Sequence, residues 1–129
     1  MEDRPVDNET KSEDLLAWNV AAIDGPSRLR ARLALVPGIV EAISRFGREA
    51  RLGWRAGTRE IAHLHAADII DVRVPATLQR QWRNDPRMMS RPRRSDWIEC
   101  RFKTLSDIEF VAMLVEIAAR HSGVRQRKA

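Results

Sequence analysis

The sequence predicts one α+β domain: an antiparallel sheet of about four strands, with helices packed on one face and a long C-terminal helix. Apolar residues repeat at helical spacing before Gly47 and again after residue 104, whereas they alternate in the segments between. Short connections join those segments, which indicates antiparallel pairing because parallel neighbours need long crossovers. A chain of 129 residues can bury its own hydrophobic core.

Charge separates an acidic arm from a basic body. The net charge is +5, and residues 1–14 contribute −4, so the rest of the chain carries +9. Residues 1–13 lack apolar periodicity, which predicts a disordered acidic arm before a single domain at 14–122 and a basic tail at 123–129. The basic body favours anionic partners such as nucleotides, nucleic acid or acidic lipid headgroups, although a solvated arginine-rich surface explains the same composition.

Three helices are expected before the sheet. The first spans 13–23 and is stopped by Asp-Gly-Pro, and the second spans 28–36 with Ser27 as its N-cap. The third is expected over 37–47, because its apolar residues have helical spacing and Gly47 is a natural stop. Those apolar residues are Ile39, Val40, Ile43 and Phe46.

After Gly47 the alternating pattern predicts strands, joined by turns, a short helix and a loop. In order they are strands at 50–57, 58–65 and 68–75, a helix at 76–85, a loop at 88–96 and a strand at 97–103. The third strand is the most regular, because Ile70, Val72 and Val74 alternate with Asp71 and Arg73. It should therefore face the core on one side only.

The final helix is predicted from a capping box and an apolar face. Ser106 and Glu109 have the spacing of a capping box, in which each side chain accepts the other residue's backbone N–H. The helix is expected to end near Gly123. Its apolar face consists of Ile108, Phe110, Val111, Ala112, Leu114, Val115, Ile117 and Ala118.

Several classes of protein are excluded by what the sequence lacks. The first residues do not resemble a signal peptide, and no apolar run approaches the ~20 residues of a membrane span, so a cytoplasmic protein without a membrane partner is expected. Walker, Rossmann, C-x-x-C, G-x-S-x-G and H-E-x-x-H motifs are absent. The single cysteine, Cys100, is expected to face the core, which argues against a thiol nucleophile.

The stretch REIAHLHAAD contains the most informative polar residues. Strand periodicity places His63 and His65 on one face with Ile61, and places Glu60 on the other. Histidine titrates near neutral pH, so acid–base chemistry or ligand contact is one interpretation. Half-buried histidines satisfied by hydrogen bonds are the simpler one.

Asp71 is the carboxylate expected beside the histidines. It can orient one imidazole by accepting its second N–H. A solvent-facing ion pair with Arg73, worth under ~1 kcal/mol, is the alternative. A metal would need a third ligand from Asp68, Asp71 or His121, and the spacing selects none of them, so no metal or other cofactor is expected.

Residues 80–103 form a basic stretch with eight basic and three acidic residues, and it includes Trp82 and Trp97. Arginines beside aromatic rings suit contacts with phosphates and bases. A loop whose tryptophans hold it to the core is the simpler interpretation. The residues expected to contact a nucleic acid are Arg83, Arg87, Arg91, Arg93 and Arg94.

Three blocks resemble the luciferase-domain family, which comprises small bacterial proteins of unassigned activity that share a domain with the fungal luciferases. The blocks read LVPGIVEAISRFG, REIAHLHAADIIDVRVPATL and SDWIECRFKTLSDIEFVAMLVEIAARH, within about residues 33 to 121. The resemblance implies that His63, His65 and Asp71 are the functional positions. In fungal members the reaction is oxygenation of a hydroxylated pyrone without metal or flavin.

The chain departs from the family in the loop before Trp97. Members commonly carry a His-Pro pair there, whereas this loop contains no histidine, and Asp96 stands where a glycine is frequent. The membrane-anchoring segment of the fungal enzymes is also missing. These departures argue against light emission and weigh against oxygenase activity, so the sequence does not decide whether the protein is an enzyme.

The leading hypothesis is a domain that binds a small organic ligand in a histidine–aspartate pocket. Its catalytic candidates are His63, His65 and Asp71, and its expected ligand contacts are Arg59, Arg73 and Trp97. The alternative is a nucleic-acid or anion-binding module built on the arginines of 80–103. A third hypothesis is a protein-interaction role in which the acidic arm shields the basic surface. The sequence does not indicate an oligomeric state.

Overall fold

The computed structural model describes residues 25–44, 50–89 and 95–128, and the fold is α+β with one antiparallel sheet. The sheet has six strands rather than about four, in the order β1-β2-β3-β4-β6-β5. The strands are β1 (Val40–Ile43), β2 (Leu52–Ala56), β3 (Arg59–Ala66), β4 (Ile69–Arg73), β5 (Met88–Met89) and β6 (Trp97–Arg101). The helices are α2 (Gly25–Leu33), α3 (Ala76–Gln79), the 3-10 helix η2 (Arg80–Trp82) and α4 (Leu105–Lys128).

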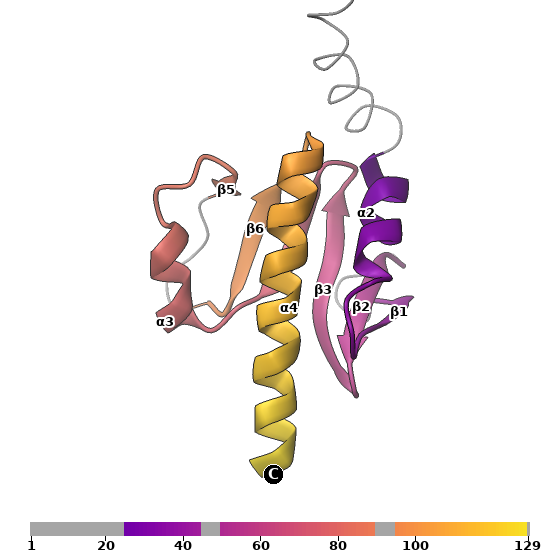
Figure 1. Cartoon of the computed structure of the whole chain (residues 1–129), viewed down its shortest axis with the longest axis vertical. Coiled ribbons are helices and arrows are strands. Elements are labelled where there is room, and N and C mark those ends of the chain that lie inside the picture. Colours follow the sequence, from indigo (N-terminus) through magenta and orange to yellow (C-terminus); the bar gives the residue numbers. More distant parts are fainter. Residues whose placement is uncertain (1–24, 45–49, 90–94, 129) are drawn as a thin grey trace, which may run out of the picture.

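Helices α2 and α4 lie side by side over one face of the sheet (Figure 1). Their buried side chains, including Leu29 and Leu114, pack against apolar residues of the central strands such as Val72 and Ile98. Burying one side chain of this size stabilises the fold by about 1.5–3 kcal/mol. The opposite face of the sheet therefore carries the polar residues of the alternating strands.

The predicted alternation of the later strands is confirmed. On β4 and just beyond it, Ile70, Val72 and Val74 are fully buried. Strand β6 pairs with β4 and directs Cys100 into the same core. The β2–β3 hairpin turns at Gly57, whose φ of 65° lies in the left-handed region that favours glycine.

The helix predicted over 37–47 is wrong. Gly38, with φ 82°, turns the chain, and β1 then pairs antiparallel with β2, with Val40 opposite Arg55. Val40 and Ile43 are 61% and 64% exposed, so their helical spacing does not mark a buried face. The β-branched residues instead suit an edge strand. Phe46 and Gly47 lie outside the described residues.

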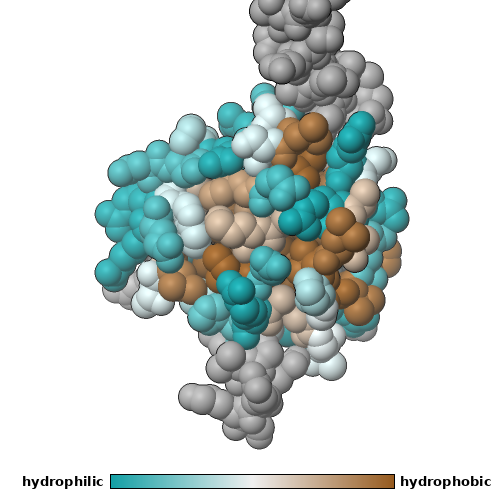
Figure 2. All heavy atoms as spheres, in the orientation of Figure 1, coloured by the Kyte–Doolittle hydropathy of each residue, from teal (hydrophilic) through white to brown (hydrophobic). Residues whose placement is uncertain are grey.

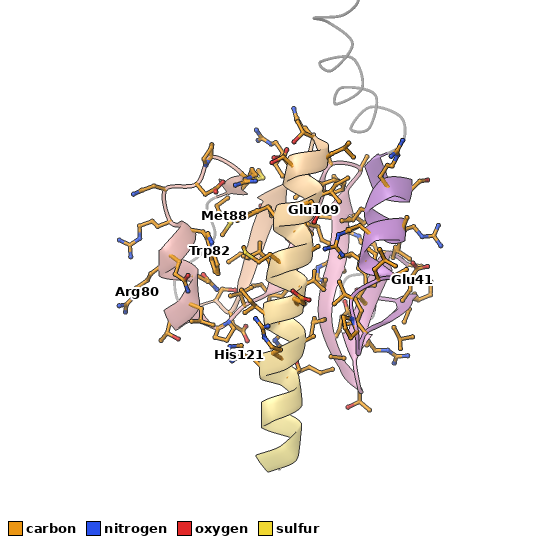
Figure 3. The ribbon with its side chains drawn as sticks, in the orientation of Figure 1. Glu41, Arg80, Trp82, Met88, Glu109 and His121 are labelled. Carbon is orange, nitrogen blue, oxygen red and sulfur yellow. The ribbon has the colours of Figure 1, made fainter. Side chains whose placement is uncertain are left out.

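The loop predicted over 88–96 is also corrected in part. Met88 and Met89 form the short edge strand β5, which pairs with Cys100 and Glu99 of β6. The predicted helix at 76–85 is present as α3 followed by η2. Figure 3 shows Trp82 and Met88 on the same side of α4, and both pack against the core. Packing of Met88 against the core therefore accompanies an edge strand in a segment whose local composition predicts a loop.

Helix α4 begins and ends at different residues from those predicted. Thr104 Oγ1 accepts the Asp107 N–H at 3.0 Å, and Asp107 Oδ2 accepts the Thr104 N–H at 3.1 Å, so the reciprocal cap is not the predicted Ser106–Glu109 pair. Glu109 instead binds Arg32 of α2 at 2.7 Å. The backbone stays helical to Lys128, past the predicted end near Gly123.

Within the described residues, no helix is long and apolar enough to cross a membrane. On the helix-covered face, hydrophilic residues surround apolar patches (Figure 2). The most exposed large apolar side chains in the described part of the chain are Leu35, Val40, Ile43, Leu105 and Met113. The predicted arm at 1–13 and helix at 13–23 lie outside the described residues.

Candidate functional site

Two irregularities in β3 shape the candidate site on the open face of the sheet. Along β2 the register shifts between the pairs Trp54–Ala62 and Arg55–Glu60, so Ile61 is an extra residue. A second shift, against β4, makes His65 the extra residue. Such bulges re-aim side chains and recur beside active sites. Glu60 therefore shares a face with His63, which corrects the predicted alternation.

His63 is held between two carboxylates. Its Nε2 lies 2.9 Å from Asp71 Oδ2, and its Nδ1 lies 3.0 Å from Glu60 Oε2. All three side chains are at least nine-tenths buried. Each ring nitrogen faces a carboxylate oxygen, and two acceptors do not form a hydrogen bond. Each contact is therefore a hydrogen bond only when a proton lies between the nitrogen and the oxygen.

Ser44 extends this chain of contacts on the far side of Glu60. Its hydroxyl donates to Glu60 Oε2, so the order is Ser44, Glu60, His63 and Asp71. Ser44 follows β1, and Gly53 of β2 makes room for it: a Cβ at Gly53 would lie 3.3 Å from the Ser44 Cβ. The edge strand and a glycine thus take part in positioning the buried histidine.

His65 is the accessible member of the cluster. Its Nδ1 lies 3.4 Å from Asp71 Oδ2 and 3.7 Å from Glu99 Oε2, and 45% of its side chain is exposed. Both histidines therefore approach the same Asp71 oxygen, one from within the protein and one from its surface. Glu99 reaches the site because β6 pairs with β4 and places it opposite Asp71.

Trp97 and Arg73 continue the site along the open face. The Trp97 ring lies 4.8 Å from the His63 ring, between centroids, and the Arg73 guanidinium lies 5.4 Å from the Trp97 centroid. Arg73 Nε donates to Asp96 Oδ2 at 3.0 Å, so its ion-pair partner is Asp96 and not Asp71 as the alternative prediction had it. The Trp97 ring thus forms an aromatic wall beside His63, and the Arg73 guanidinium places a positive charge at its end.

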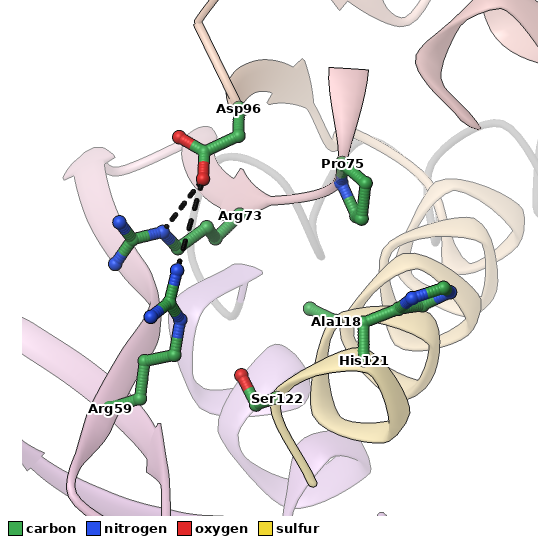
Figure 4. A pocket seen from close by; sticks show the side chains of 7 residues that line it. All are labelled: Arg59, Arg73, Pro75, Asp96, Ala118, His121 and Ser122. Carbon is green, nitrogen blue, oxygen red and sulfur yellow. Dashed lines mark hydrogen bonds and ion pairs between the residues drawn. The ribbon is translucent and has the colours of Figure 1, made fainter. Parts of the chain in front are cut away.

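Arg59 meets Arg73 at the end of the sheet. Its Nη2 lies 4.0 Å from the same Asp96 oxygen, and Figure 4 shows both guanidinium groups turned to this carboxylate. The small pocket here also borders α4, where His121 lies across from the arginines. His121 is consequently separate from the His63–His65 cluster.

The structure thus brings together most of the residues singled out in the sequence. His63, His65, Asp71, Trp97 and Arg73 form one continuous group, and Arg59 joins it through Asp96. The residues that the sequence did not indicate are Ser44, Glu60 and Glu99. For Glu99 the available signal was its alternation with Ile98 and Cys100, which places it on the face away from the core.

Metal-ligand atoms come together at one place in the described part of the chain. Atoms of His65, Asp71 and Glu99 all lie within 4.8 Å of one another. Of the third ligands considered from the sequence, Asp71 belongs to this group, whereas Asp68 and His121 do not. Glu99 takes the place that they were expected to fill.

The arginines expected to contact a nucleic acid do not gather on one surface in the part of the chain that the structure describes. Arg87 binds Asp85 through two side-chain contacts at 2.8 Å, and its guanidinium lies 3.9 Å from the Phe110 centroid. These hydrogen bonds hold the pKa of Asp85 below its usual value. Arg83 is exposed, and Arg80 points away from the domain in Figure 3. Arg91, Arg93 and Arg94 lie outside the described residues.

Cys100 takes no part in the site. Its side chain is buried in the core, and burial raises the pKa of its thiol to about 12. A thiol with that pKa is protonated at neutral pH, which agrees with the prediction that Cys100 is not a nucleophile.

The fold and site define a small α+β domain with a histidine–carboxylate cluster on the open face of an antiparallel sheet. The family model of the luciferase domain matches residues 58–118, which include β3, β4, β6 and their cluster residues. Over this segment the chain is similar to the luciferase-domain family. No curated protein and no solved structure matches the chain.

Proposed function

We propose that the domain binds a small organic molecule on the open face of the sheet, at His63, His65 and Asp71. The observation that carries the proposal is the convergence of both imidazoles on one Asp71 oxygen, at 2.9 and 3.4 Å, while His65 stays 45% exposed. Polar groups that converge beside an aromatic wall are typical of ligand sites. The match to the luciferase domain over residues 58–118 includes all three residues and supports the same location.

The residues divide into contact and positioning groups. His65 is the exposed polar side chain, so it would contact the ligand, with Asp71 behind it. His63 is buried between Glu60 and Asp71, so its role would be to hold Asp71 in place. A buried polar network whose members are all paired is rigid, which would keep Asp71 in one orientation.

A hydroxylated aromatic compound with an acidic group fits these side chains best. Its hydroxyl would meet His65 and Asp71, its ring would lie near Trp97, and its anionic group would approach Arg73 or Arg59. Aromatic rings prefer offset or edge contacts with tryptophan, and guanidinium binds carboxylates in a fixed geometry. Turnover of such a compound under air would extend binding to an oxygenase-like activity.

The test is a thermal-shift screen of phenolic acids, followed by calorimetry of the compounds that stabilise the protein. A ligand at one hundred times its Kd adds about 2.7 kcal/mol to the free energy of unfolding. His65→Ala should weaken binding about 10- to 100-fold through the lost hydrogen bond and leave the fold intact. Trp97→Leu should weaken it as well.

Arg28→Ala is the control, because it removes an exposed side chain from α2, which covers the face of the sheet opposite the cluster. It should leave the Kd unchanged. A ligand whose Kd responds to Arg28→Ala but not to His65→Ala or Trp97→Leu would place the binding site elsewhere and overturn the proposal.

A further inference from the structure

We propose that His65, Asp71 and Glu99 bind a divalent first-row transition-metal ion. The Nδ1 of His65 lies 3.4 Å from Asp71 Oδ2 and 3.7 Å from Glu99 Oε2, and ligand atoms of all three residues lie within 4.8 Å of one another. Ligands held at about 2.0–2.2 Å from one ion lie at most about 4.4 Å from each other, so the separations of 3.4 and 3.7 Å already fit. Small side-chain adjustments would therefore suffice.

The mixture of donors favours a particular class of metal. One imidazole and two carboxylates suit Mn²⁺, Fe²⁺ or Zn²⁺, whereas Mg²⁺ and Ca²⁺ prefer oxygen alone and soft metals prefer sulfur. Cys100, the only thiol of the chain, is buried in the core on the other face of the sheet. The set of ligands is thus borderline-hard, with no sulfur donor.

Charge in the cluster also favours a cation. Glu60, Asp71 and Glu99 bring three carboxyl groups to two imidazoles, and the Asp71 and Glu99 side chains are only 6% and 16% exposed. Carboxylates placed close together in a poorly solvated site repel one another. A dication between Asp71 and Glu99 would relieve this repulsion.

The surroundings of Asp71 resemble the outer shell of a metal site. Metal-bound carboxylates are commonly held by hydrogen bonds from a second layer of residues. Here His63 Nε2 contacts Asp71 Oδ2 at 2.9 Å, Glu60 holds the other ring nitrogen, and Ser44 donates to Glu60. His63 thus contacts the carboxylate directly, and Glu60 and Ser44 support His63 in turn.

The site is open on one side. His65 is 45% exposed, so solvent or an oxygen of an organic ligand can reach a metal from that side. In this respect the inference deepens the proposed function and rests on it, because it places the metal in the site proposed for the organic molecule. Metal binding can still be measured in the absence of that molecule.

The test uses Co²⁺ with the full chain, freed of any affinity tag. Calorimetry should give one saturable site, and bound Co²⁺ should produce visible absorption bands that Zn²⁺ displaces. Loss of an outer-shell partner typically weakens metal binding about 10–100-fold. His65→Ala and Glu99→Gln remove direct ligands, so each should weaken Co²⁺ binding by at least that factor. His121→Ala should leave both signals unchanged, and circular dichroism should report a folded protein in every variant.

The outcomes separate this inference from the proposed function. No saturable Co²⁺ binding, or binding that His65→Ala and Glu99→Gln leave unaltered, would overturn the metal site even if phenolic acids still bind. Loss of the signal in His121→Ala would do the same, since it would assign the ion to a surface histidine. Saturable, His65-dependent Co²⁺ binding without any organic ligand would support the metal and count against the proposed function alone.

Discussion

At the scale of single residues, the two histidines have different environments although they are two positions apart. His63 is buried with both ring nitrogens facing carboxylates, whereas His65 is close to half exposed. His65 is also the bulge residue, which stands outside the β3–β4 register. One histidine is therefore built into the fold and the other is available for binding.

His63→Ala should reduce the free energy of unfolding by about 3 kcal/mol, because it leaves Glu60 and Asp71 buried without the imidazole between them. His65→Ala should cost under about 1 kcal/mol, because the His65 side chain is 45% exposed and its loss buries no new polar group. Urea unfolding monitored by tryptophan fluorescence measures both. Equal and small losses would show that the buried contacts contribute little, and His63 would then be free to act as a ligand contact.

Cys100 should resist thiol reagents in the native protein. Its thiol has a pKa of about 12, so at pH 8 only about one molecule in ten thousand carries the reactive thiolate. Reactivity should rise as the pH approaches 12, and at pH 8 it should appear once denaturant removes the burial. Labelling with a chromogenic disulfide measures the rate in both states. Complete labelling of the folded protein within minutes at pH 8 would contradict the buried assignment.

At the scale of elements, the start of α4 depends on the chain just before the helix. Thr104 and Asp107 satisfy each other's backbone N–H groups, and Asp107 Oδ2 also accepts the Lys103 N–H at 2.8 Å. Two of the four unpaired N–H groups at a helix start find partners in such a box. The cap ties β6 to the helix that covers the core.

Thr104→Ala should therefore lower the free energy of unfolding by about 1 kcal/mol. Ser106→Ala is the matched control, because Ser106 is exposed and the observed cap does not use it. Thermal unfolding followed by circular dichroism compares the two variants. A larger loss for Ser106→Ala would restore the cap that the sequence predicts.

At the scale of the whole molecule, the positive charge of the chain leaves nucleic-acid binding as an alternative. The net charge is +5, and exposed Arg80 and Arg83 lie around η2. Arg87, in contrast, forms an ion pair with Asp85 and lies over the Phe110 ring, so its contacts are within the fold. Nucleic-acid binding stays a prediction from composition.

If that alternative holds, DNA affinity should fall about a thousandfold between about 50 and 200 mM salt for six phosphate contacts. Arg83→Glu should weaken binding more than Arg28→Glu, a matched charge change at an exposed position of α2. Fluorescence anisotropy of labelled DNA measures both. Equal weakening by the two variants would indicate a response to net charge rather than a binding surface.

Much of the fold follows from local pattern, but several parts of the site do not. The alternation around Asp71 and the spacing of His63 and His65 are visible in the sequence, as is the apolar face of α4. Glu60 was not predicted to join the site, because a strand of regular period places it on the other face of the sheet from His63. The bulge that reverses this depends on pairing with β2, a contact between separate segments.

The sequence by itself determined the α+β class, the succession along the chain of β2, β3, β4 and β6, and the similarity to the luciferase domain, because periodicity and composition are local properties of the chain. The tertiary structure alone decided that residues 40–43 form an edge strand, that β6 inserts beside β4, and that Glu99 therefore reaches Asp71 and His65. The physical reason is that strand partners and bulges are selected by packing and hydrogen bonding between distant segments, which a local pattern does not record.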